Sequence, residues 1–340
     1  MTGQEPVVKH SPADFAVREN LVVDLVPRDA ASHQYLLLRK TGYTTFEAIR
    51  LIAEELAVPP GEVSYAGLKD EDGVTEQLVA VTAPGMDGPD RTITDGPARR
   101  LELRHYGYGT APLAVGRLNG NGFRVVIRNL EGAAAERLAG TRTHTTFFLN
   151  YYDIQRFGVP NGKKLTHMVG EAILADDWDT ALKTLGELGT PESAQAHDWT
   201  GGGREFFRRL EPRVTAFYCA AHASFQWNTA LREMTVETCP RESRELRIEG
   251  LRYAYVTSPQ AAVRVLNATR DLPNTRYSFS EGQPRATTVP RATVVQTVLN
   301  AESPAPDEFF PGRSRVTLSF FLPSGCYATA ALRQVLGYRP

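Results

Sequence analysis

A lysine and an aspartate stand together in a short polar segment of this sequence. Residues 65–77 read YAGLKDEDGVTEQ, so Lys69 and Asp70 lie between two stretches that favour strands, at 62–68 and 74–82. A connection between two strands could present such a pair to a cleft, where it could have a catalytic role. Lys-Asp and Asp-Gly pairs are also ordinary turn residues. Both interpretations, a catalytic pair and a plain turn, stay open on these residues alone.

Searches for other kinds of site narrow the field. Residues 158–164, GVPNGKK, lack the glycine spacing of a phosphate-binding loop, and the glycines at 201–203 follow no strand of a dinucleotide-binding fold. The seven histidines show no metal-binding spacing. The three cysteines are too scattered for a disulfide framework or a metal site, at Cys219, Cys239 and Cys326. We therefore expect no metal.

The composition is that of a folded protein. Of the 340 residues, 42% are hydrophobic and 23% are charged. No apolar run is long enough to span a bilayer and the first residues lack the features of a signal peptide, so we expect a cytoplasmic protein without membrane contact. The net charge of −1 gives no support for nucleic-acid binding by the field of the whole molecule. Any RNA site must be built from local basic clusters.

Arginines form such clusters, at 99–104, 204–213 and 241–252. Within 204–213, two pairs are spaced four residues apart, so on a helix each pair would share a face that could follow a phosphate backbone. The pairs are Arg204 with Arg208 and Arg209 with Arg213. The alternative is a solvated helix face balanced by nearby acids.

Hydrophobic patterning predicts a β-rich part followed by a helical part. Thr44 and Glu47 form a capping-box pattern that begins a helix through Leu56. Strands are predicted at 13–26, 34–39, 62–68, 74–82, 122–130 and 315–323, a surface excursion at 84–98, a mainly helical region from 133 to 235 with helices at 165–175 and 215–234, and a last helix at 326–336. The simplest architecture is a β-rich domain interrupted by a largely helical insert and completed by about the last 35 residues.

Five blocks of this sequence resemble the TruD family of pseudouridine synthases, in the order in which the family has them. The blocks are Lys-x-x-Pro-x-Asp-Phe-x-Val-x-Glu at 9–19, Ala-Gly-x-Lys-Asp with Val-Thr-x-Gln at 66–77, Asn-x-Phe with a final Arg at 121–128, Asn-Tyr-Tyr with Gln-Arg-Phe-Gly at 150–158, and Leu-Pro-x-Gly-x-Tyr-Ala-Thr at 322–329. Coincidence is a poor explanation, because the blocks run through most of the chain.

The resemblance implies an α+β fold. A pseudouridine synthase catalytic domain with a curved mixed sheet would comprise residues 1–155 and 305–340. A largely helical α/β insertion, residues 156–304, would form the second wall of an RNA-binding cleft. The family isomerises uridine to pseudouridine in tRNA, best known at position 13, and uses neither cofactor nor metal. We expect the protein to act as a monomer on tRNA or a uridine nucleotide.

The resemblance also implies catalytic roles. Asp70 would be the nucleophile that attacks the sugar or removes a proton from it, because it matches the catalytic aspartate of the family. Lys9 would pair with Asp70 and keep it ionised in a partly dry pocket. The alternative for Lys9 is a residue of a disordered tail. Lys69 would support the loop that binds the substrate rather than take part in the chemistry.

Substrate contacts follow from the need to hold a base outside its stack. Phe123 is the candidate stacking surface, with Phe15 and Tyr327 as further walls. Asn121 would hydrogen-bond the base or the sugar, and Arg156 would contact phosphate or organise the cleft. Phe15 could equally be a core residue.

The sequence departs from the family pattern close to these residues. The family generally has a basic residue soon after the Lys-Asp pair, whereas this sequence has Glu71 and Asp72 there. In addition, Gly73 stands in place of an alanine and Asp153 in place of a glycine. Acids beside the nucleophile would repel a phosphate backbone. One alternative is therefore an enzyme of this type that acts on free UMP or uridine for C-nucleoside biosynthesis. A second is a catalytically silent RNA-binding protein.

Overall fold

The structure is a computed structural model that describes residues 5–69, 71–82, 90–96, 98–140, 142–160, 162–268, 272 and 274–337. The chain forms two compact units. Unit 1 comprises Met1–Thr145 and Thr297–Gly325, and unit 2 comprises Thr146–Gln296 and Cys326–Pro340. The sequence-based boundaries of a catalytic domain and an insertion, at 155/156 and 304/305, stay a prediction.

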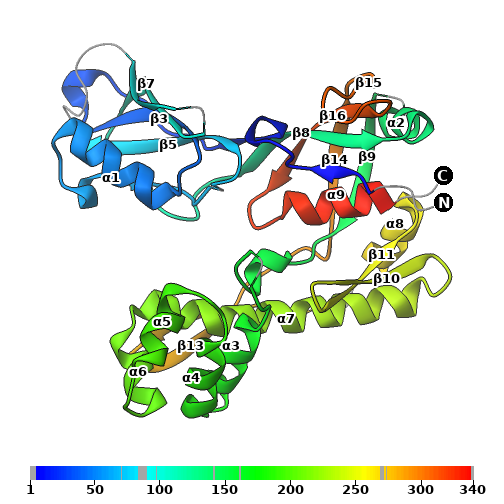
Figure 1. Cartoon of the computed structure of the whole chain (residues 1–340). Helices are drawn as coiled ribbons and strands as arrows, with labels where there is room; N and C mark the ends of the chain where they lie inside the picture. Colours follow the sequence, from blue (N-terminus) through cyan, green and yellow to red (C-terminus); the bar gives the residue numbers. More distant parts are fainter. Residues whose placement is uncertain are drawn as a thin grey trace. The chain divides into compact units, whose positions relative to one another are not determined.

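In the described part of the chain, twelve strands form one mixed sheet (Figure 1). Nine of them follow the order β6-β7-β3-β5-β2-β8-β16-β14-β9, and the three short strands β1, β4 and β15 pair with β8, β5 and β16, respectively. The β2–β5 pair is parallel, whereas β2 pairs with β8 in antiparallel register. The strands are β1 (Val7–Val8), β2 (Phe15–Asn20), β3 (His33–Thr41), β4 (Ser64–Tyr65), β5 (Val74–Thr82), β6 (Arg91–Asp95), β7 (Arg100–Gly109), β8 (Gly120–Leu130), β9 (Thr143–Leu149), β14 (Val294–Ala301), β15 (Ala305–Pro306) and β16 (Ser314–Pro323).

Helix α1 (Thr45–Leu56) covers one face of this sheet at β3, β5 and β7 (Figure 1). It begins with the predicted capping box, in which Thr44 Oγ1 accepts from the Glu47 backbone N–H and the Glu47 carboxylate accepts from Thr44 N–H. Ile52 on α1 and Leu38 on β3 belong to one core and are fully buried. Helix α2 (Gly132–Ala139) follows β8.

Most predicted elements are confirmed, including the α+β class, the helix after Thr44 and the strand at 74–82. The strand predicted at 13–26 ends at Asn20, and the one at 62–68 has two residues, Ser64 and Tyr65. The prediction of a mainly helical region from 133 missed β9, whose sequence THTTFFL is rich in residues that favour strands. The predicted surface excursion also contains the strand β6.

A buried arginine on β8 joins three segments of unit 1. Arg128 donates two hydrogen bonds to the Asp14 carboxylate, at 2.9 and 2.8 Å, and one each to Asp307 and Glu308, both at 3.0 Å. These bonds raise the pKa of Arg128 despite its burial. The pKa of Glu308 is lowered to about 2 by its hydrogen bond from Arg128. The pKa of Asp14 is lowered as well, by its hydrogen bonds from Arg128 and Ser11 acting against burial. Asp14 and Glu308 are therefore anions at neutral pH, and Arg128 stays charged.

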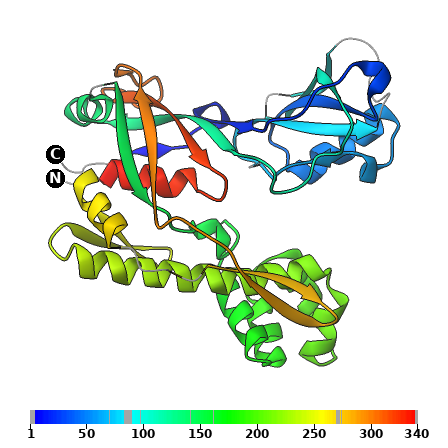
Figure 2. The same cartoon turned by 180° about the vertical axis from the view of Figure 1, so that it is seen from behind.

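Unit 2 is organised along helix α7 (Pro212–Thr238) (Figures 1 and 2). Residues near its start join one core with α3, α4, α6 and β12, and residues near its end join a second core with β11, α8 and α9. The remaining elements are α3 (Thr166–Leu174), α4 (Trp178–Gly186), α5 (Pro191–His197), α6 (Gly203–Arg209), α8 (Pro259–Asn267), α9 (Ala328–Gly337), the hairpin β10 (Ser243–Ile248) to β11 (Leu251–Val256), and the hairpin β12 (Thr275–Ser280) to β13 (Gln283–Thr288). No helix of the described residues is long and apolar enough to cross a membrane.

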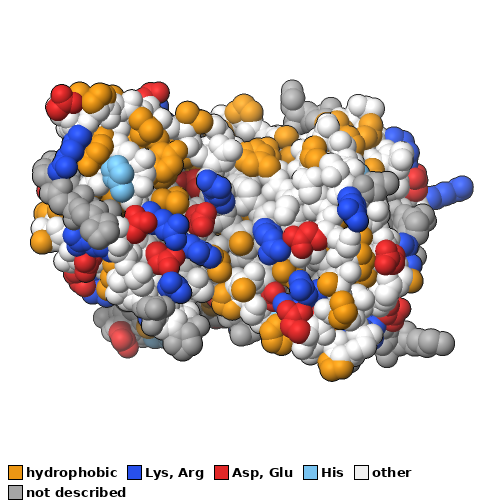
Figure 3. All heavy atoms as spheres, turned by 90° about the horizontal axis from the view of Figure 1, so that it is seen from above, with side chains coloured by type: hydrophobic (Ala, Val, Ile, Leu, Met, Phe, Trp, Pro, Cys, Tyr) orange, Lys and Arg blue, Asp and Glu red, His pale blue; other side chains and the backbone are white. Residues whose placement is uncertain are grey.

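Of the two predicted arginine pairs in 204–213, only Arg204 with Arg208 lies on one helix, α6. Helix α6 ends at Arg209 and α7 begins at Pro212, so Arg209 and Arg213 lie on different helices. Arg204 is paired with Asp176 at 2.8 Å and Arg209 with Glu205 at 3.0 Å. The mixing of charges is not confined to this segment, since basic and acidic side chains are also interspersed over the face that is drawn in Figure 3. The solvated face balanced by acids is the better interpretation of this cluster.

Replacing Arg128 with methionine should lower the free energy of unfolding by about 3–5 kcal/mol, because buried carboxylates would lose their counter-charge. Arg124→Met is the matched control, since Arg124 on the same strand makes an exposed pair with Glu302. That change should cost less than about 1 kcal/mol. Urea denaturation followed by far-ultraviolet circular dichroism measures both. Equal losses in the two variants would contradict this account.

A pH dependence is expected from His167 on α3, which stacks on Phe225 with ring centroids 4.1 Å apart. Burial, with the charge of His222, lowers the pKa of His167 to about 4. Between pH 6.5 and 4 the unfolded chain takes up a proton at this residue and the folded chain does not, so stability falls as the pH falls through that window. The loss should be about 2 kcal/mol after allowance for partial solvent contact.

His167→Phe should remove that part of the pH dependence, and His197→Gln, which changes an exposed histidine of unit 2, should not. Tryptophan fluorescence during urea unfolding isolates unit 2, because Trp178, Trp199 and Trp227 all belong to it. A His167→Phe protein whose stability falls with acid as steeply as that of the wild type would refute the assignment.

Candidate functional site

One face of the sheet in unit 1 carries a strip of aromatic and polar side chains. The antiparallel register places Val17 opposite Phe123 and Glu19 opposite Asn121, and the parallel register places Val17 beside Thr75. Directly opposed residues of a sheet share a face, so β2, β5 and β8 contribute to one surface. We call this surface the strip. It contains residues from three of the family blocks, namely Phe15, Val17 and Glu19 on β2, Thr75 and Gln77 on β5, and Asn121 and Phe123 on β8.

Lys9, Phe15 and Phe123 lie together in this strip. The Lys9 Nζ lies 4.0 Å from the centroid of the Phe15 ring. The Phe15 ring is 6.0 Å from that of Phe123, which stacks on Phe320 at 5.4 Å. Phe15 is 1% exposed, so it supports Phe123 and Lys9 from the core, whereas Phe123 is half-buried and keeps part of its ring accessible. The structure places Lys9 in an ordered segment between β1 and β2 rather than in a tail.

The backbone at Lys9 is unusual. Its φ of 61° lies in the left-handed region, which a side chain with a Cβ seldom adopts. Such a conformation costs on the order of 1 kcal/mol or more and persists where the surroundings impose it. Pairing of Val7 and Val8 with β8 holds one side of Lys9, and the Asp14 bonds to Ser11 N–H and Arg128 hold the other. Its ammonium group is thus directed over Phe15 by the fold.

Several acceptor atoms of the strip are buried but have no hydrogen-bond partner among the described residues. They are Asn121 Oδ1, Thr75 Oγ1 and Gln77 Oε1. Buried polar atoms are almost always hydrogen-bonded, so each exception calls for an explanation. The amide Nε2 of Gln77 is used structurally, since it donates to Gly67 O at 3.0 Å. Asn121, beside half-buried Phe123, is suited to contact a ligand.

Asp70, the predicted nucleophile, lies outside the described residues. Its neighbours in sequence are held firmly. The Lys69 backbone N–H donates to Thr45 Oγ1 at 2.9 Å, and the Glu71 carbonyl accepts from Gly42 N–H at 3.1 Å. The buried ammonium of Lys40 donates to Lys69 O at 3.3 Å and to Tyr43 O at 2.8 Å. Sequence reasoning missed Lys40, because a lysine within a strand carries no signal of burial.

Lys69 itself is committed to the scaffold. Its Nζ lies 2.7 Å from Glu19 Oε1, and the two side chains are 5% and 1% exposed. The other Glu19 oxygen accepts from Leu78 N–H at 3.3 Å. Gly73 is also explained, since a Cβ there would lie 2.6 Å from Phe15 O, so the alanine of the family would require the β2 backbone to move.

Unit 2 holds the other two predicted site residues. Arg156 lies at the end of η4 (Ile154–Arg156), with its guanidinium 4.8 Å from the exposed Phe217 ring. Tyr327 packs 5.9 Å from Tyr152. Burial raises the pKa of Tyr327, and the charges of Arg156 and Arg291 act in the opposite direction. Sequence reasoning missed Arg291, whose guanidinium lies 3.8 Å from the Tyr152 ring.

The acid at position 153 is buried and paired with a cation. Asp153 is 3% exposed and forms an ion pair with Arg333. Its charge is therefore balanced inside unit 2, and the predicted repulsion of a phosphate by this residue loses its basis. Glu71 and Asp72 are exposed. Among the residues that the structure describes, no cluster of histidine, cysteine and acidic side chains could hold a metal ion.

Comparisons with known proteins agree with this picture. The family model described as tRNA pseudouridine synthase D (TruD) matches residues 1–213. A protein of Halobacterium salinarum named probable tRNA pseudouridine synthase D is 32% identical over 266 residues, which cover 72% of this chain and 57% of that protein. The tRNA pseudouridine synthase D of Geobacter metallireducens is 27% identical over 100% of this chain and 97% of its own length.

The fold is shared with a solved structure. The crystal structure of a putative tRNA pseudouridine synthase D from Methanosarcina mazei superposes with a TM-score of 0.62 at 18% identity, and the match covers 100% of this chain and 95% of that one. Because the family model matches well over half of the sequence and the strip on β2, β5 and β8 is built from the family's own blocks, this chain belongs to the TruD family.

Proposed function

We propose that this chain is a pseudouridine synthase that isomerises uridine in tRNA, at position 13, with Asp70 as the nucleophile. The reaction breaks the bond between N1 of uracil and C1′ of the sugar and joins C5 to the same carbon. C5 loses a proton and N1 gains one, so the atoms balance without an oxidant or a reductant. The names of the relatives and the match of the sequence to the family support the reaction and the substrate.

The observation that carries the proposal is the strip on unit 1. Phe123 and Asn121 belong to one sheet face, and the ammonium group of Lys9 lies over Phe15 of that face. Glu19 of the same face binds the ammonium group of Lys69, the residue before Asp70. In the proposed mechanism Asp70 attacks C1′ while positive charge develops on the sugar. Lys9 keeps the Asp70 carboxylate ionised. Phe123 stacks on the extruded uracil, and the Asn121 amide hydrogen-bonds its edge.

The residues of unit 2 would serve the RNA. Tyr327 is proposed as a second stacking surface, and Arg156 as a contact to phosphate. The proposal for Arg156 rests on its few hydrogen bonds. Within the described residues its guanidinium makes one side-chain hydrogen bond, a long one of 3.4 Å from Nε to Ser224 Oγ. A guanidinium without a carboxylate partner is well suited to a phosphate.

The test is release of tritium from tRNA transcribed with [5-³H]uridine, because C5 loses its hydrogen when it joins the sugar. The wild-type protein should release label to water, and Asp70→Asn should be slower by at least about 1,000-fold, since the nucleophile is gone. Asp72→Asn is the control, because Asp72 lies two residues after Asp70, is exposed and loses the same charge. This variant should remain active. A tRNA with cytidine at position 13 should release none.

The same assay distinguishes this function from the two alternatives, an enzyme that acts on a free nucleotide and a catalytically silent RNA-binding protein. Release from [5-³H]UMP but not from tRNA would replace the proposed substrate with a free nucleotide. A protein that binds tRNA but releases label from neither substrate would be a silent RNA-binding protein. Equal rates for the wild type and Asp70→Asn would remove Asp70 from the mechanism.

Asn121→Ala should reduce kcat/KM for tRNA by about 10- to 100-fold, the loss expected for one or two hydrogen bonds to the substrate. Its urea midpoint should stay unchanged, because Asn121 Oδ1 has no protein partner in the described part of the chain. Asn129→Ala on the same strand is the control. It should reduce stability instead, since Asn129 Nδ2 donates to Glu5 O at 3.1 Å and the residue has a φ of 60°. Full activity of Asn121→Ala would show that this amide does not touch the substrate.

A further inference from the structure

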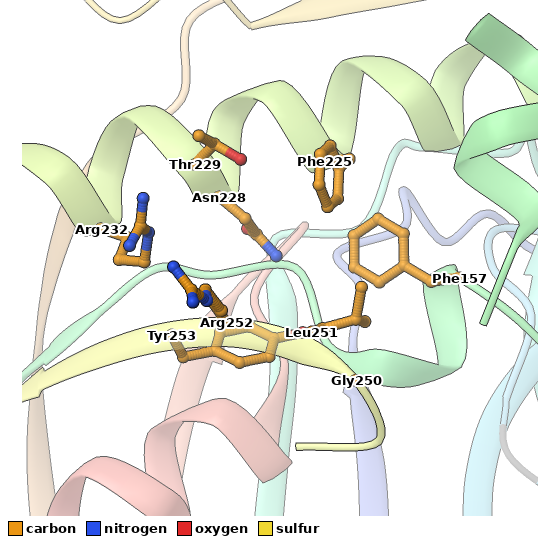
Figure 4. Close-up of a pocket in the computed structure, with 9 residues that line it drawn as sticks. All are labelled: Phe157, Phe225, Asn228, Thr229, Arg232, Gly250, Leu251, Arg252 and Tyr253. Atoms are coloured by element: carbon orange, nitrogen blue, oxygen red, sulfur yellow. The ribbon is translucent and has the colours of Figure 1, made fainter. Parts of the chain in front are cut away.

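A pocket of about 280 Å³ lies wholly within unit 2 (Figure 4). The middle of α7 forms one side, the start of β11 forms another, and Phe157, the residue after η4, closes one end. Its apolar walls are the side chains of Phe157, Phe225, Leu251 and Tyr253. The volume lies just below the usual range for drug-sized ligands, so the pocket suits a small molecule or a single unit of a polymer.

The aromatic end of this pocket is rigid. Phe225 stacks on His167, with rings 4.1 Å apart and inclined by 15°, and meets Phe157 edge to face. Because the pKa of His167 is lowered to about 4 by burial, its ring is neutral near pH 7 and supports Phe225 as an apolar plate. The turn of the β10–β11 hairpin is tethered by the Lys164 ammonium, 2.9 Å from Glu249 Oε2. The walls are therefore formed before any ligand arrives.

The other end of the pocket is cationic. In Figure 4 the guanidinium groups of Arg232 and Arg252 lie toward one end and the rings of Phe157 and Phe225 toward the other. The Arg232 guanidinium forms ion pairs with the carboxylates of Glu245, at 3.0 Å, and Glu233, at 3.2 Å. Arg252 is exposed, and no carboxylate of the described residues lies within ion-pair distance of it. An anionic group can therefore approach Arg252 without displacing an acid.

We propose that this pocket binds one nucleoside monophosphate unit, with the base against Phe225 and Phe157 and the phosphate at Arg252. Stacking of a base on an aromatic ring contributes about 1–3 kcal/mol, and arginine binds phosphate through paired N–H donors. Thr229 on α7 adds a hydroxyl group beside the base. The unit is a free mononucleotide or one nucleotide of an RNA strand. The RNA source rests on the proposed function, whereas the chemistry of the pocket does not.

Calorimetric titration of the full chain with AMP tests the free source. AMP is chosen because its base cannot be isomerised, so the result does not depend on catalysis. Arg252→Gln should weaken AMP binding by about 10-fold, the value of one charge-assisted bond. Thr229→Trp should abolish binding by filling the pocket. Adenosine, without phosphate, should bind the wild type and Arg252→Gln equally.

Arg244→Gln is the matched control, because Arg244 is an exposed arginine on the partner strand of the same hairpin and does not line the pocket. It should leave AMP affinity unchanged. The second arm measures tRNA affinity by filter binding with the same variants. A loss of several-fold in Arg252→Gln and Thr229→Trp, but not in Arg244→Gln, would assign the pocket to a nucleotide of the RNA even if AMP alone does not bind.

The proposal is overturned if neither AMP nor tRNA binding responds to Arg252→Gln and Thr229→Trp, or if Arg244→Gln has the same effect as Arg252→Gln. Failure of the proposed function has a different signature. A protein that releases no tritium but binds AMP through Arg252 would retain the pocket and lose the synthase assignment. Conversely, a protein that releases tritium but whose AMP and tRNA affinities are unchanged by all three substitutions would retain the synthase assignment and lose the pocket.

Discussion

The buried guanidinium of Arg128 is the interaction on which unit 1 depends. It binds Asp14 and Asp307, which are 114 and 179 residues away in sequence, and a charge so buried is stable only with its partners in place. Asp14 directly precedes β2, the strand that lies between the parallel partner β5 and the antiparallel partner β8. The same bonds therefore fix the turn that carries Lys9 and place three family blocks on one face of the sheet.

Polar groups on that face fall into two kinds, and the division separates scaffold from candidate substrate contacts. Lys69 and Glu19 satisfy each other, and Lys40 fixes the Lys69 carbonyl, so these charges hold the segment before position 70. Asn121 Oδ1 is buried without a partner among the described residues. Asn129 Oδ1 on the same strand is buried without a partner in the described chain too, so the missing hydrogen bond alone does not single out Asn121. Asn121 differs because it lies on the same face as the half-buried Phe123 ring, where a ligand could supply the missing donor.

Charge is balanced locally over much of the molecule. Asp153 is paired with Arg333, and Arg204 and Arg209 of α6 are paired with acids of the same region. A field from the whole molecule cannot attract RNA at a net charge of −1, so recognition must depend on a few cations without carboxylate partners. Arg252 is such a cation in the described part of unit 2, and it stands beside a preformed aromatic pocket.

The sequence by itself determined the elements with local signals and the family. The capping box at Thr44, the run of residues that favour strands in β5 and the block around Asp70 depend on neighbouring residues, and all can be recognised without coordinates. Burial of Lys40, the stacking of Arg291 on Tyr152 and the pocket at Phe225 were decided by the tertiary structure alone. Each requires contacts between residues far apart in the chain, and such contacts leave no periodicity or spacing in the sequence.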